Sequence, residues 1–72
     1  MTQLSAAQYD KLERAIQTGG RIALFRRGTE YVVVPKALRL RDNREWIEAL
    51  HPTTGEALTF SIDEVDRIEE IA

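Results

Sequence analysis

The stretch "GTEYVVVP", residues 28–35, places a turn, four strand-forming residues and a proline within eight positions. Tyr31–Val34 offer apolar side chains to both faces of a strand, so the sequence predicts that both faces are buried. In a chain of 72 residues, such a strand belongs in a closed or strongly curved sheet, because one face of a small flat sheet would be wet. Pro35 has no backbone N–H to donate, so it must lie at a bulge or a strand end.

A helix is predicted before this strand, over about residues 6–18. Ser5 is a good N-cap, and Gln8 is placed three residues later to reach back to it and complete a capping box. Two glycines, residues 19–20, end the helix, one of them in the left-handed conformation. The apolar stripe that would face a core consists of Tyr9, Leu12 and Ile16.

After the helix the hydrophobic period changes to two, which predicts strands. Residues 30–41 are expected to form one long strand bent at Pro35, and the last segment fits either a helix or a short strand after a one-turn 3₁₀ connection. We favour the strand, because a fifth strand would close a barrel. The other strands are predicted over about residues 21–26, 45–50, 57–62 and 66–71. The predicted core is Ile22, Leu24, Val32, Val34, Leu58, Phe60 and Ile62, with the helix packed across one open end through Leu12 and Ile16.

The expected fold class is therefore mainly β with one α-helix. Residues 1–72 would form a single small domain, in which an N-terminal helix precedes a five-stranded, strongly bent antiparallel barrel.

The formal net charge of −2 conceals an uneven distribution of charge. Residues 21–44 carry seven Lys and Arg against two Asp and Glu, a balance of +5, whereas residues 45–72 carry one Arg against eight Asp and Glu, a balance of −7. A basic segment of this kind is typical of a surface for an anionic partner. The alternative is that the two segments form neighbouring strands whose charges meet across the sheet.

Composition narrows the class of protein. The chain has no cysteine, so it has neither disulfides nor thiolate metal sites, and we expect a reducing, cytoplasmic setting. No uninterrupted apolar run exceeds four residues, the length of Tyr31–Val34, which is far below the ~20 residues of a spanning helix, so we expect no membrane partner.

The sequence offers no arrangement typical of catalysis. His51 is the only histidine and precedes Pro52 in a predicted turn, where we expect it to be solvated. No glycine-rich phosphate loop occurs, and the acidic residues of positions 63–70 lack the spacing of a calcium loop. We therefore expect a chain that is not an enzyme and that uses no cofactor and no metal.

The basic segment Arg21–Arg44 holds the best candidates for contact with a partner. Alternation places Arg39 and Arg41 on one face of a strand, and Trp46 follows on the next strand. A tryptophan near arginines can anchor a protein partner or stack on a base, although a core position is the alternative. A bend at Pro35 would bring these side chains to one rim of the barrel. The candidate partner-binding residues are Arg26, Arg27, Lys36, Arg39, Arg41, Arg44 and Trp46.

A helix followed by five short strands, the second of them bent, resembles the order of the Sm-like and SH3-like small barrels. The chain resembles the Rof family of bacterial Rho-inhibitor proteins in "AAQYDKLERAI", residues 6–16, and "LTFSIDEVDRIE", residues 58–69. The resemblance implies a lone regulatory module that docks on a larger protein, one of the transcription machinery.

The chain also resembles the barrel of WYL domains, in "VVVPKAL", residues 32–38, and "REWIEALHPTTGEALTFSIDEVDRI", residues 44–68. Trp46 falls where the WYL aromatic pair begins, while Ile47 and Glu48 replace the characteristic tyrosine and leucine. This second resemblance implies binding of nucleic acid or small ligands. Docking on a protein is the function we predict, and nucleic-acid binding through the basic segment is the alternative.

Overall fold

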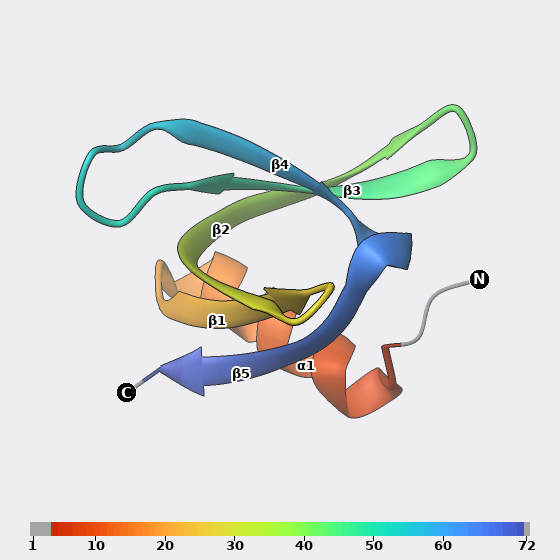
Figure 1. The fold of residues 1–72 in the computed structure, drawn as a ribbon, viewed down its shortest axis with the longest axis horizontal. Helices are drawn as coiled ribbons and strands as arrows, with labels where there is room; N and C mark the ends of the chain where they lie inside the picture. Colours follow the sequence, from red (N-terminus) through yellow and green to blue (C-terminus); the bar gives the residue numbers. More distant parts are fainter. Residues whose placement is uncertain (1–3, 72) are drawn as a thin grey trace.

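The computed structural model describes residues 4–71 and contains one helix and five strands in that part of the chain (Figure 1). This confirms the predicted order of elements, a helix followed by strands. The elements are α1 (Ala6–Thr18), β1 (Arg21–Arg26), β2 (Thr29–Arg41), β3 (Arg44–Leu50), β4 (Ala57–Ser61), the 3₁₀ turn η1 (Ile62–Glu64) and β5 (Val65–Ile71).

The five strands form one antiparallel sheet in the order β4-β3-β2-β1-β5. The long strand β2 pairs with β1 through its first half and with β3 through its second half, and it curves from one layer of the molecule to the other (Figure 1). β4 and β5 are the two edges and do not pair with each other, so the sheet is strongly bent but is not a closed barrel.

Pro35 lies at the bend of β2, as predicted. The register of β2 against β3 shifts between Pro35 and Ala37, which leaves Lys36 as the extra residue of a bulge. A bulge increases local twist and bends the strand, and a proline there breaks no ladder bond. The proline is buried, so the bend is packed against the core.

The core lies between α1 and the inner face of the sheet. Ile22, Leu24, Phe60 and Ile62 are buried, as predicted. The further core residues that the sequence-based core did not include are Leu4, Ala15, Val33, Ile47, Ala49, Val65 and Ile68, while Val34 and Leu58 are half-buried. Ala23 is also buried, but on the outer face of β1.

The prediction that β2 is buried on both faces is wrong at Val32. This side chain is 39% exposed, whereas its neighbour Val33 is 1% exposed. Val33 pairs with Ile22 and shares its inward face, so Val32 faces outward with Ala23. Because the sheet stays open, its outer face remains in contact with solvent.

The N-terminus of α1 is capped as the sequence predicts, since the Ser5 hydroxyl accepts the backbone N–H of Gln8 at 3.2 Å. The second half of the capping box is wrong. The Gln8 side chain does not return to Ser5, and instead its Oε1 accepts the backbone N–H of Ile68 in β5. Gly19 ends the helix with φ of 73°, in the left-handed region that favours glycine.

α1 packs against the core through Leu12, which is fully buried, while Ile16 is only partly buried. The Tyr9 hydroxyl donates to Glu45 Oε1 at 2.8 Å and links the helix to β3. The helix is therefore held against the sheet by apolar packing and by polar contacts with β3 and β5.

Two tight turns set the registers of the hairpins. Arg27 and Gly28 join β1 to β2, and Asp42 and Asn43 join β2 to β3, all four with positive φ. Two-residue connections of this kind match the twist of the flanking strands. The last segment is a strand, β5, which follows the single 3₁₀ turn, and it pairs with β1 rather than with β4.

Candidate functional site

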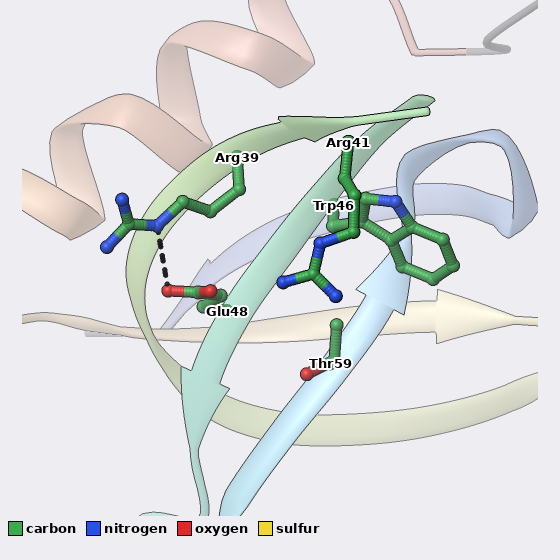
Figure 2. Close-up of a pocket in the computed structure, with 5 residues that line it drawn as sticks. All are labelled: Arg39, Arg41, Trp46, Glu48 and Thr59. Atoms are coloured by element: carbon green, nitrogen blue, oxygen red, sulfur yellow. Dashed lines mark hydrogen bonds and ion pairs between the residues drawn. The ribbon is translucent and has the colours of Figure 1, made fainter. Parts of the chain in front are cut away.

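A groove runs over the outer face of β2, β3 and β4, on the side of the sheet away from the core. It encloses about 240 Å³. Figure 2 shows the side chains that line it, which come from all three strands. We call it the arginine groove, defined by Arg39, Arg41, Trp46, Glu48 and Thr59.

Strand alternation determines which side chains reach this groove. Arg39 is the Cα partner of Trp46, and Glu48 is the Cα partner of Thr59. Ile47, between Trp46 and Glu48 in the chain, is fully buried on the opposite face. Because successive side chains of a strand point to opposite faces, the register of β2, β3 and β4 places all the groove residues on the same face of the sheet.

The two arginines of the groove differ in their pairing. Arg39 Nε donates to Glu48 Oε1 at 3.1 Å, and the two side chains are 63% and 40% exposed. The Arg41 side chain has neither a hydrogen bond nor an ion pair with any residue of the described range 4–71. Its guanidinium extends across β3 toward Thr59 (Figure 2). The groove therefore contains one cation that is already paired and one that is available.

Trp46 has an unused hydrogen-bond donor. Its Nε1 and the Oγ of Ser61 are buried, and neither has a hydrogen-bond partner within the part of the chain that the structure describes. The two residues are Cα partners on β3 and β4. A buried polar group without a partner costs free energy. Trp46 itself is half-buried, between the core and surface positions that the sequence left open.

A second hollow of about 240 Å³ adjoins the arginine groove and shares Glu48 and Thr59 with it. Lys36, the bulge residue, lines this hollow together with Leu50 and Ala57. Since Lys36 has no ion pair within residues 4–71, the two hollows together present a continuous face with an unpaired cation in each.

The structure does not bring Arg26 and Arg27 to this face. The Arg26 guanidinium carbon lies 5.0 Å from the centre of the Tyr31 ring, and Arg26 Nη1 lies 3.8 Å from Glu64 Oε1. Arg27 Nη2 is 3.6 Å from Glu64 Oε2, and its backbone N–H donates to Asp66 at 3.0 Å. These two arginines hold the first hairpin against η1 and β5, which is the cross-element charge pairing that the alternative interpretation predicts.

Arg44 is the Cα partner of Arg41 at the end of the second hairpin, but it does not line the groove. Of the candidate partner-binding residues, the structure therefore gathers Arg39, Arg41 and Trp46 in one groove, with Lys36 next to it. It adds Glu48 and Thr59, which sequence reasoning missed. The feature that could have identified these two residues is the register of strands β2, β3 and β4, because each of them lies opposite a groove residue on the neighbouring strand.

His51 has a defined role in the loop after β3. It is half-buried, and its Nδ1 accepts the backbone N–H groups of Thr53 and Thr54 at 3.1 and 3.2 Å. The prediction of a turn residue is confirmed, and the half-buried imidazole, whose hydrogen bonds lie at the exposed surface, organises that turn. Among residues 4–71, no group of three or more His, Asp or Glu side chains is arranged to hold a metal ion.

The helix in the described part of the chain is too short and too polar to cross a membrane. Comparison with protein-family models and with curated proteins finds no match to this chain. The resemblances to the Rof and WYL families therefore stay predictions from the sequence.

Proposed function

We propose that the chain is a small non-catalytic binding module that docks on a larger protein through the arginine groove. The observation that carries this proposal is the unpaired guanidinium of Arg41, which lies in a hollow beside a half-buried tryptophan. Arginine and tryptophan are the residues most enriched among those that dominate protein interfaces. The groove thus combines an apolar anchor with a cation whose pairing is left to a partner.

The composition of the groove favours a protein over nucleic acid. Glu48 places a carboxylate in the groove, bonded to Arg39, where it would repel a continuous row of phosphates. The chain as a whole is also acidic, with a pI near 5.3, which disfavours nonspecific attraction to nucleic acid. An acidic side chain of a protein carries a single local charge, so it fits the groove better than a row of phosphates does.

The resemblance to the Rof family supports a regulatory role on a protein of the transcription machinery. The absence of cysteine agrees with action in the cytoplasm. Nucleic-acid binding by an Sm-like barrel is the second candidate. It is favoured by three cations, Lys36 and Arg41 on β2 and Arg44 on β3, whose side chains have no ion pair within residues 4–71 and which lie on the strand of Trp46 or on its neighbour.

The proposal is tested by capture of partners from a nuclease-treated lysate of the organism that encodes the chain. The tagged wild type is compared with the double variant Arg39→Glu/Arg41→Glu. The control, Arg14→Glu/Arg21→Glu, makes the same change in net charge outside the groove. We expect the wild type and the control to recover the same protein and the groove variant to lose it, with all three melting within a few degrees of each other.

Recovery that is unchanged in the groove variant, or lost equally in the control, would contradict docking through the groove. A fluorescent single strand tests the second candidate. Affinity that falls steeply with salt and is lost in the groove variant would favour nucleic-acid binding instead, because counterion release accompanies phosphate contacts.

A further inference from the structure

The two edges of the sheet differ in how they are protected against pairing with another strand. β5 carries four charged side chains among its seven residues, and the backbone N–H of Ile68 is already taken by the Gln8 side chain. β4, with the sequence ALTFS, has no charged residue, no proline and no bulge. Charges, prolines, bulges and covering elements are the usual means of blocking an edge strand. β4 is therefore the open edge of this sheet.

The backbone of β4 offers hydrogen-bonding groups on its free side. The N–H of His51 donates to the carbonyl of Glu56 at 2.8 Å, which makes these two a hydrogen-bonded pair. In an antiparallel ladder, hydrogen-bonded and non-hydrogen-bonded pairs alternate. Along the register from that pair, Leu58 again bonds to β3, whereas the N–H and C=O groups of Ala57 and Thr59 point away from it. Both of these residues are exposed.

The charge next to this edge selects the chemistry of a partner. The Arg41 guanidinium crosses β3 and reaches toward Thr59 on the outer face (Figure 2). A strand added beside β4 would lie about 5 Å from it, with its side chains again alternating between the two faces. An outward carboxylate opposite Thr59 would then meet the unpaired Arg41, and charge-assisted bonds to arginine are the stronger kind.

We propose that the free edge of β4 accepts an extended acidic segment of a partner protein as a sixth strand, with its carboxylates directed toward Arg41. This inference rests on the proposed function and identifies how the groove is used. Main-chain hydrogen bonds to Ala57 and Thr59 hold the added strand, and Arg41 makes the edge prefer an acidic segment.

The inner face of the same edge adds a second requirement. Leu58 is half-buried and lies against the core cluster, and Phe60 is buried beside it. Partner residues that point inward would lie next to these two side chains and should be apolar. The segment we infer therefore alternates acidic and apolar residues, which is the pattern of a half-buried strand with one charged face.

The probe for the test is a synthetic peptide of alternating glutamate and valine, capped at both ends, and the matched peptide has glutamine in place of glutamate. Binding is followed by amide hydrogen exchange and by NMR shifts of the labelled full chain. We expect the glutamate peptide to bind about tenfold more tightly than the glutamine peptide. The amides of Ala57 and Thr59 should gain protection on binding, and those of β5 should not.

Two pairs of variants separate the backbone contribution from the charge. Thr59→Pro removes an N–H that makes no bond to β3, so the chain should fold but lose the peptide, whereas Thr59→Val keeps the N–H and should retain the binding that Thr59→Pro loses. Arg41→Glu should weaken binding of the glutamate peptide by about tenfold or more, whereas Arg21→Glu on β1, with the same change in net charge, should not. Exchange protection in the wild type provides the backbone test if Thr59→Pro does not fold.

Loss of binding in Arg41→Glu without protection of Ala57 and Thr59 would overturn strand addition and leave docking through the groove intact. An equal effect of Arg21→Glu would show that only general electrostatic attraction is at work. If neither peptide binds at millimolar concentration, the inference is wrong. Docking of a protein through the groove is tested separately, by the capture experiment described above.

Discussion

The side chain of Gln8 in α1 accepts the backbone N–H of Ile68 in β5, and so the helix closes one edge of the sheet. Ile68 pairs with Leu24 of β1 on its other side, which leaves that N–H without a strand partner. Ile68 is fully buried, so the amide cannot turn to water for an acceptor. This polar side chain therefore helps to join the N-terminal helix to the β5 edge of the sheet.

Gln8→Ala should lower the free energy of unfolding by about 1–3 kcal/mol, because it leaves a buried N–H without an acceptor. Gln8→Glu keeps an acceptor oxygen and should recover most of the loss. Urea unfolding measures both changes, and hydrogen exchange at Ile68 locates them. If exchange at Ile68 is unchanged in Gln8→Ala, this bond does not protect the edge in solution.

The second prediction concerns two adjacent valines. Val33→Ala should cost about 2 kcal/mol or more, because it opens a cavity in the core at a side chain that is 1% exposed. Val32→Ala removes the same atoms from a side chain that is 39% exposed and should cost about 0.5 kcal/mol or less. Thermal or urea unfolding of the two variants checks the difference. Equal losses would mean that β2 is buried on both faces after all.

These two valines show which features of the fold could not be predicted from the sequence. The helix, the strand order and the turns have local signals: a capping serine, a period of two, and Arg-Gly or Asp-Asn pairs that tolerate positive φ. A run of three valines has no alternation, so it cannot indicate which member faces the core. That choice depends on the register with β1, which pairs Val33 with Ile22.

In the candidate site, too, local features could be predicted from the sequence, whereas features that depend on contacts between elements could not. Alternation correctly placed Arg39 and Arg41 on one face, because that relation is local to one strand. The position of Arg26 could not be obtained this way, since it depends on the approach of η1, which brings Glu64 near the first hairpin. Glu48 and Thr59 were missed because their place in the groove depends on the register of three strands.

The third prediction concerns the loop between β3 and β4, residues 51–56. His51→Ala removes the acceptor for two backbone N–H groups and should destabilise the protein by about 1–2 kcal/mol. His51→Asn can present an oxygen close to the position of Nδ1 and should lose less, since asparagine makes the same type of turn. Exchange rates of the Thr53 and Thr54 amides show whether the loop has opened. Identical stability of the two variants would mean that these bonds contribute little.

The last prediction uses the carboxylate that already occupies the arginine groove. Glu48 bonds to Arg39 and so competes with any acidic group of a partner for that cation. Glu48→Gln keeps the shape of the side chain and removes its charge, which leaves both groove arginines available. Stability should change by about 0.5 kcal/mol or less, because exposed ion pairs contribute little. Affinity for the alternating glutamate peptide should rise several-fold, and titration by NMR measures it. Glu56→Gln makes the same charge change outside the groove and should leave the affinity near that of the wild type. If Glu48→Gln instead weakens the peptide, the Arg39–Glu48 pair is needed to shape the groove, and Arg39 would be a positioning residue rather than a contact for the partner.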